Sequence, residues 1–160
     1  SINHKKGNQI FDFPFLFIYE EIIMLIKEFI AKTEKDYMVA TLLKQYKVEK
    51  VKVKYKSMKD YAHYNVDTGT LELSSKYKEI KPGQIKEFLI TILHEIYHAM
   101  DAKKYGWRKF KDMYEIEMNM ISQGHYPGKT DPYKDNKYEI NAEKFGVKNM
   151  PRWKSHFTKN

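Results

Sequence analysis

The fold of this chain is decided by residues 84–106, QIKEFLITILHEIYHAMDAKKYG. Apolar side chains recur there every three or four residues, which is the period of an α-helix with one buried face. The stretch follows a Pro-Gly pair, a start signal, and ends at a glycine, a common helix terminator. We therefore predict a helix from Gln84 to Tyr105. Its buried face would hold Ile85, Phe88, Leu89, Ile92, Ile96, Ala99 and Met100.

The residues before this helix predict two helices and then a small sheet. Apolar residues have helical spacing at about 18–31 and again at about 36–46. In VKVKYK, residues 51–56, apolar residues alternate with lysines, which predicts a strand with one buried and one solvated face. The segment YAHYNVDTGTLELS, residues 61–74, alternates on both sides of a DTG turn and predicts a hairpin. Together these strands predict a three-stranded antiparallel sheet.

The residues after the central helix predict a helix, a loop and a last helix. Helical spacing continues at about 109–121. Residues 122–136, SQGHYPGKTDPYKDN, are dense in Gly, Pro, Asp and Asn, which favour turns. A short helix at about 136–145 would follow and stop at Gly146.

Length and composition indicate one α+β domain. The chain has 160 residues, 42% of them apolar, which is enough for one substantial core. We assign residues 1–17 to an N-terminal arm and residues 18–160 to the single domain. Charged residues and a proline interrupt the most apolar segment, residues 11–30, and no small-residue cleavage site follows. These features argue against a membrane partner, and we expect a soluble, cytoplasmic protein.

Charge and cysteine content narrow the possible functions. The net charge of +8 is compatible with an acidic partner such as nucleic acid. Yet Arg108 and Arg152 are the only arginines, whereas phosphate and base recognition favours the bidentate guanidinium, so the composition argues against specific nucleic-acid binding. The chain contains no cysteine, which excludes disulfides and thiolate metal sites. A transition metal would therefore be held by His, Asp or Glu.

The central helix carries two histidines at metal-ligand spacing. His94 and His98 are four residues apart, so they project from one side of the helix, one turn apart, and both rings can reach one ion. Glu95 points one step around the helix, where it would reach a metal-activated water and act as general base. The pattern therefore predicts a hydrolytic zinc site, with a pair of unliganded histidines beside a core as the alternative.

A catalytic zinc usually takes three protein ligands, so a third must come from downstream. Glu139 and Glu143 are four residues apart on the last predicted helix, and the small Ala142 beside them would allow close approach to the first helix. We predict that Glu139 binds the metal and that Glu143 accepts the free ring N–H of one histidine. A solvated helix face is the alternative for this pair. Glu115, Glu117 and His125 remain alternative third ligands.

The sequence resembles the short cytoplasmic gluzincin-type peptidases of the ImmA/IrrE kind. The resemblance rests on HEIYHA, residues 94–99, and on EINAEKFG, residues 139–146, and it covers roughly residues 48–146. It implies a zincin-like domain with zinc ligands His94, His98 and Glu139 and with Glu95 as catalytic base. It also implies that an extended substrate peptide adds to a sheet edge, for which the candidate is the strand at residues 70–74. Glu143 departs from the family pattern, which has Asn or Asp there.

These observations predict a zinc-dependent endopeptidase with one zinc per chain and a peptide or protein substrate. His125, Tyr126 or Tyr133 from the loop would contact the substrate or the transition state. The alternative is a non-catalytic, basic regulator or nucleic-acid-binding protein of a mobile element, with a structural or vestigial metal site. A metal-dependent amidase acting on cell-wall peptide is a third hypothesis, against which the lack of an export signal argues.

Overall fold

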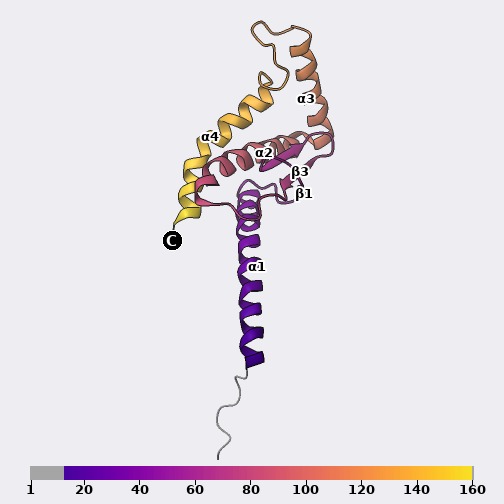
Figure 1. The fold of residues 1–160 in the computed structure, drawn as a ribbon. Coiled ribbons are helices and arrows are strands. Elements are labelled where there is room, and N and C mark those ends of the chain that lie inside the picture. The colour runs from indigo at the N-terminus through magenta and orange to yellow at the C-terminus, as the bar shows by residue number, and fades with distance from the viewer. Residues whose placement is uncertain (1–12, 160) are drawn as a thin grey trace, which may run out of the picture.

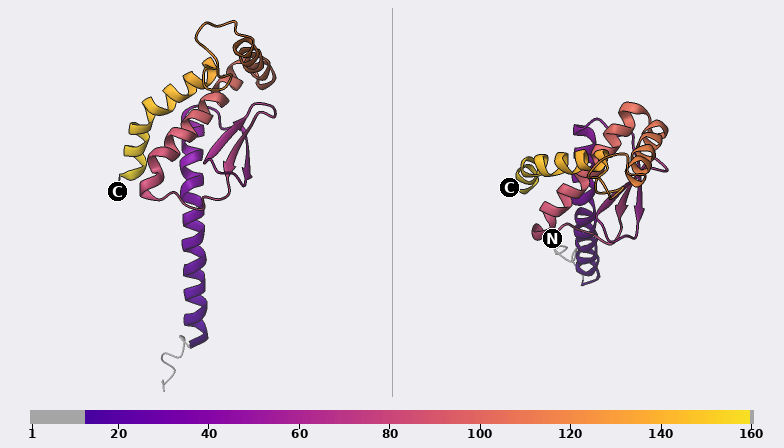
Figure 2. Two further views of the ribbon diagram at one scale, coloured as in Figure 1. Left: turned by 45° about the horizontal axis from the view of Figure 1, so that its top comes forward. Right: turned by 90° about the horizontal axis from the view of Figure 1, so that it is seen from above.

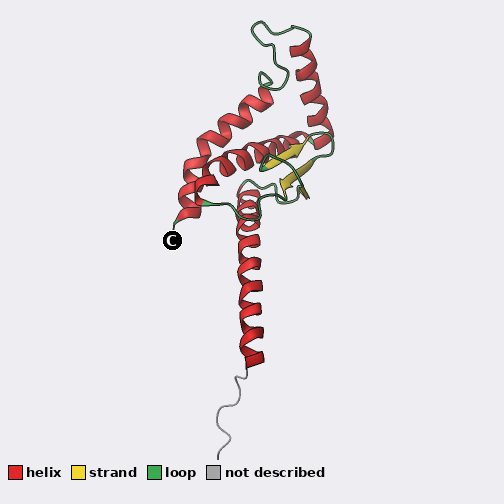
Figure 3. Ribbon diagram, viewed as in Figure 1, coloured by secondary structure: helices red, strands yellow, loops and turns green. Residues whose placement is uncertain are grey.

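The protein forms an α+β arrangement of helices around a three-stranded mixed sheet (Figures 1 and 3). The computed structural model describes the backbone of residues 13–159 and the side chains of residues 14–26 and 34–159. The elements are α1 (Phe13–Gln45), β1 (Lys52–Lys56), β2 (Ala62–Asn65), β3 (Thr70–Ser74), the 3-10 helix η1 (Pro82–Gln84), α2 (Ile85–Tyr105), α3 (Trp107–Ser122) and α4 (Lys137–Thr158).

Helix α2 is the centre of the fold, and it confirms the helix predicted from its periodicity. It lies between α4 and the sheet, as the left view of Figure 2 shows. Gly106, with φ of 86°, ends the helix in a backbone conformation that suits glycine. The predicted apolar face is buried in the core, except that Met100 is half-buried. This burial fixes the rotation of α2 and therefore the direction in which its histidines point.

Helix α1 is continuous where two helices were predicted. It spans Phe13–Gln45, and no glycine or proline interrupts residues 31–36, so the gap in apolar spacing does not mark a helix end. Residues 13–17 of the predicted arm belong to this helix, and the rest of the arm lies outside the described residues. The C-terminal part of α1 packs into the core, whereas its N-terminal part projects away from it (Figure 1). Exposed side chains there include Leu16, Phe17, Ile18, Met24 and Leu25.

The sheet is mixed, so the prediction of an antiparallel sheet was wrong for one strand pair. The predicted hairpin is confirmed, because β2 pairs with β3 in antiparallel register. Strand β1, however, pairs with β3 in parallel, and the strand order is β1-β3-β2. An alternating pattern indicates which side chains share a face, but it carries no information on the direction of a neighbouring strand.

Strand β1 also differs from prediction in its burial. All five residues of β1 are exposed, including Val53 and Tyr55, which were expected on a buried face. β1 is an edge strand, so one side has no strand partner, and its lysines are of the kind that protects sheet edges from aggregation.

Helix α4 continues well past Gly146, where the last helix was predicted to stop. It runs from Lys137 to Thr158 and contains Pro151. The N-cap is Asn136, whose side chain accepts a hydrogen bond from the Tyr138 N–H at 3.0 Å. Gly146 is a packing residue and not a terminator. A Cβ at this position would lie 2.7 Å from the carbonyl oxygen of Ile90 on α2.

Candidate metal centre

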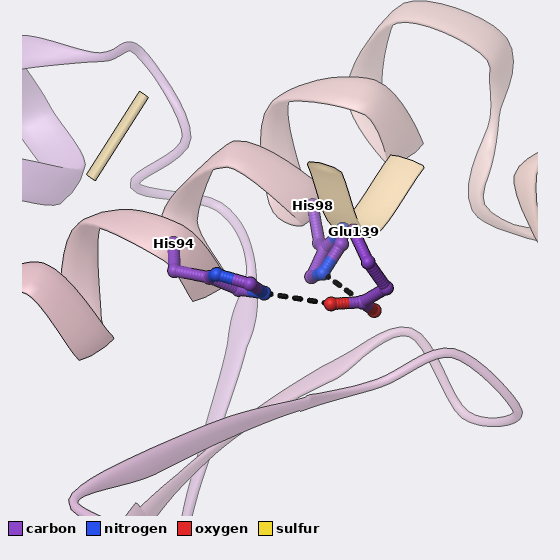
Figure 4. Close-up of side chains that lie close together, drawn as sticks. All are labelled: His94, His98 and Glu139. Carbon is purple, nitrogen blue, oxygen red and sulfur yellow. Dashed lines mark hydrogen bonds and ion pairs between the residues drawn. The ribbon is translucent and has the colours of Figure 1, made fainter. Parts of the chain in front are cut away.

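Two histidines of α2 face the first turn of α4 (Figure 4). The ring centroids of His94 and His98 are 5.0 Å apart, as expected for residues one helical turn apart. The His94 side chain is 12% exposed and the His98 side chain 2%. The pair therefore lies at the margin of the core, with one ring inside it and the other reaching towards its edge.

Glu139 on α4 contacts both histidines. Its Oε2 atom lies 2.8 Å from Nε2 of His94, and its Oε1 atom lies 3.0 Å from Nε2 of His98 (Figure 4). One ligand atom from each of the three residues lies within 4.8 Å of the other two, and this group could hold a metal ion. The two helices pack closely enough for this because Ala142, one turn after Glu139, is completely buried.

The chemistry of the three donors fits a metal. His98 is 1% exposed, and neither of its ring nitrogens has a hydrogen-bond partner. Its Nε2 is close to the Glu139 carboxylate but is not aligned for a hydrogen bond with it. A buried polar atom without a partner is costly, and a cation shared with Glu139 would satisfy this nitrogen. Two imidazoles and one carboxylate form a donor set typical of catalytic zinc.

Glu143 fixes the orientation of the His94 ring. Its Oε2 atom lies 2.9 Å from Nδ1 of His94, on the side of the ring opposite Glu139. Burial alone would lower the pKa of His94, but the hydrogen bonds with Glu139 and Glu143 and the charge of Glu95 raise it to about 9. With a proton held on Nδ1 by Glu143, Nε2 is the nitrogen presented to Glu139 and to a metal.

Tyr114 on α3 is a residue of this site that the sequence did not indicate. Its hydroxyl donates a hydrogen bond to Oε1 of Glu139 at 2.7 Å, in a buried position. Burial alone would raise the pKa of Glu139, but its contacts with His94 and His98 and this hydrogen bond hold it well below its usual range. Nothing in the local sequence distinguishes Tyr114 from the other twelve tyrosines, because its role depends on α3 and α4 both packing against α2.

Glu95 is buried beside His94, His98 and Glu139 but is not one of the residues that could hold the metal. The residue as a whole is 7% exposed, and its Oε2 atom accepts a hydrogen bond from the backbone N–H of Tyr64 on β2 at 2.6 Å. Burial raises the pKa of Glu95, while the nearby rings of His98 and His94 oppose this shift. A carboxylate with a raised pKa next to a group that could hold a metal is suited to accepting a proton from water.

Of the three loop residues predicted to contact substrate, Tyr133 is at the site. Its hydroxyl lies next to Glu139, and burial followed by the charge of that carboxylate raises its pKa. His125 is exposed, and its Nε2 lies 3.1 Å from the side-chain oxygen of Gln123. The Tyr126 hydroxyl lies 3.4 Å from Glu117. His125 and Tyr126 thus make their contacts within the loop and with α3.

The alternative third ligands are engaged in other ways. Glu115 is exposed, with Lys111 at 3.9 Å. Glu117 is buried but lies 3.7 Å from Lys129 and 3.9 Å from Lys137. Over the part of the chain that the structure describes, His94, His98 and Glu139 form the one group of three His, Asp or Glu residues arranged to hold a metal.

The strand expected to bind substrate has no free edge. β3, residues 70–74, is the central strand and is paired on both sides, so it cannot accept a further strand. The edge nearest the site belongs to β2. Tyr64 lies opposite Leu71 of β3 in this sheet, and its backbone N–H donates a hydrogen bond to Glu95 on α2. Sequence alternation could not identify this edge, because it does not determine strand order.

Comparison of this chain with protein-family models, with curated proteins and with solved structures gave no match. None of the helices in the described residues combines the length and the apolar character that crossing a membrane requires.

Proposed function

We propose that this protein is a zinc-dependent peptidase with a zincin-like fold, related to the ImmA/IrrE-like gluzincins. The observation that carries the proposal is the convergence of His94 and His98 with Glu139, which follows His98 by 41 residues and lies on another helix, with Glu95 buried beside them. A lone pair of histidines on a helix would need no carboxylate from a distant helix. It would also need no second acid, Glu143, on the far side of one ring.

In this proposal each residue has a defined task. His94, His98 and Glu139 would hold the zinc, which would supply Lewis-acid activation of water and of the scissile carbonyl. Glu143 and Tyr114 orient the ligands His94 and Glu139 through their hydrogen bonds.

Glu95 carries the proton transfers. One of its oxygens is held by the Tyr64 N–H, so the other is available to remove a proton from the attacking water. Water oxygen bonds to the carbonyl carbon, the C–N bond breaks, and Glu95 returns the proton to the leaving amine. The Tyr133 hydroxyl, next to Glu139, donates a hydrogen bond to the developing oxyanion.

Metal analysis and three variants test this function. The purified protein should bind about one zinc per chain and cleave an unstructured protein substrate such as casein. Glu95→Gln should retain the zinc and lose cleavage, because it removes the base and leaves the three ligands in place. His98→Ala should lose both, because the buried ligand is gone. His125→Ala is the matched control and should retain both, since His125 is exposed in the loop. Full cleavage by Glu95→Gln would refute the mechanism.

A further inference from the structure

A groove adjoins the candidate metal centre and runs along α4. Its volume is about 700 Å³, within the range of sites that enclose a ligand. His94 and Glu139 form its inner end, so it is continuous with the place where we propose that hydrolysis occurs. Its lining also includes Tyr133, Lys134, Ile140, Lys144, Val147 and Lys148.

The groove has apolar walls. Ile140 and Val147 are almost two helical turns apart on α4, and Val147 is 51% exposed, which is unusual for a branched aliphatic side chain. The aliphatic stems of the neighbouring lysines extend this apolar surface. The groove therefore suits an apolar side chain of a bound peptide.

The rim of the groove is positively charged. Lys134, Lys144 and Lys148 line it, and all three are exposed. Among the side chains that the structure describes, none of these lysines forms an ion pair with a carboxylate. The only acids lining the groove, Glu139 and Glu143, are both engaged by His94. The rim thus has positive charge that a substrate can neutralise.

The distances of two rim lysines from Glu139 match whole numbers of residues in an extended peptide. Lys144 and Lys148 follow Glu139 by five and nine residues, which places them about 7.5 and 13.5 Å further along the helix axis. An extended peptide advances about 3.3 Å per residue, so these distances correspond to roughly two and four residues from the reacting bond.

We propose that the substrate is an acidic segment of a polypeptide, with an apolar side chain near the scissile bond and carboxylate side chains two to four residues from it. This inference rests on the proposed peptidase function and adds a substrate class to it. The apolar side chain occupies the space between Ile140 and Val147, and the carboxylates reach the ammonium groups of Lys144, Lys148 and Lys134.

Two sets of quenched fluorescent peptides test the inference. Both sets have a central pair of leucines, and they carry either glutamates or lysines at the positions two and four residues away on each side. The zinc-loaded protein should have a KM about tenfold lower for the glutamate set with a similar kcat, since each exposed charge pair contributes a factor of a few. The difference should shrink in 0.5 M salt because of screening.

The double variant Lys144→Glu and Lys148→Glu should abolish or reverse this preference. The matched control is Lys52→Glu with Lys54→Glu, which makes the same change of net charge on the exposed strand β1 and should retain the preference. Equal KM values for both sets in the unmodified protein would overturn the inference, as would a preference that the Lys144 and Lys148 changes leave intact.

A binding measurement separates this inference from the proposed function. The Glu95→Gln variant should bind a labelled glutamate peptide about tenfold more tightly than the lysine peptide in fluorescence anisotropy. If neither set is cleaved but this difference is found and disappears with the Lys144 and Lys148 changes, the peptidase function fails and the groove's selectivity holds. If cleavage occurs without any charge preference in either assay, the inference fails and the peptidase function holds.

Discussion

Replacing Gly146 by alanine should separate α4 from α2 and weaken the metal centre. The added Cβ would lie 2.7 Å from the carbonyl oxygen of Ile90 and 3.4 Å from the backbone nitrogen of His94. Both neighbours are backbone atoms of a packed helix, so they cannot move aside as a flexible side chain would. Relieving the contact to 3.0 Å requires a shift of at least 0.3 Å between the helices.

Two opposing energies set the size of the effect on stability. Alanine is about 1 kcal/mol more favourable than glycine inside a helix. Forcing extra volume into a packed interface usually costs about 1–3 kcal/mol, and the contact with a backbone oxygen places this site towards the upper end. We therefore expect the free energy of unfolding of Gly146→Ala to fall by about 1–2 kcal/mol, or about 2–4 °C in Tm for each kcal/mol.

The same shift should weaken metal binding. Glu139 is on α4 seven residues before Gly146, while His94 and His98 are on α2, so a separation of the helices moves one ligand away from the other two. Metal-site geometry tolerates errors of only about 0.2 Å in ligand distance, and we expect zinc affinity to fall at least tenfold.

Urea denaturation of the metal-free protein and competition with a chromophoric zinc chelator measure the two effects. Gly83→Ala is the matched control, because a Cβ there meets nothing within 4 Å, and it should keep stability and zinc affinity unchanged or slightly improved. The reasoning is refuted if Gly146→Ala is as stable as the unmodified protein and binds zinc equally well.

Two further predictions concern the contacts around the carboxylate and the ring. Tyr114→Phe should lower zinc affinity about tenfold, because Glu139 loses the hydroxyl that orients it. The control Tyr126→Phe should leave zinc affinity unchanged. Equal zinc affinities of the two variants in chelator competition would contradict this prediction. Between about pH 4.5 and 6.5, the contact between His94 and Glu139 should stabilise the metal-free protein fully. The contribution of His94 should be lost as pH rises through about 9, because the pKa of His94 is raised in the folded protein. The contribution of Glu139 should be lost as pH falls below 4.5, because the pKa of Glu139 is lowered. Zinc needs the neutral ring, so binding at pH 7.5 should release about one proton, measurable by calorimetry in buffers of different ionisation enthalpy, and zero release would contradict the raised pKa.

Local patterns were enough to predict the parts of the fold and site that depend on neighbours in sequence. The 3.6-residue spacing of apolar residues predicted α2 and its buried face, and the alternation around the DTG turn predicted the β2–β3 hairpin. The i, i+4 spacing placed His94 and His98 on one side of α2, and Glu139 and Glu143 on one side of α4. Each pattern involves residues within one or two turns of each other, where backbone geometry alone determines the relative positions of side chains.

Other features of the fold and the site depend on residues that are far apart in the chain and meet only when it folds. The parallel pairing of β1 with β3, and hence the free edge at β2, follows from strand order, which side-chain alternation does not encode. Helix α4 continues through Gly146 and packs against α2 there, because glycine has no side chain to hold the two backbones apart. Tyr114 reaches Glu139 because α3 and α4 both pack against α2. Local sequence spacing thus establishes which residues share a helix face. Which faces meet depends on how the helices pack, because contacts form only at the short distances that the folded chain brings about.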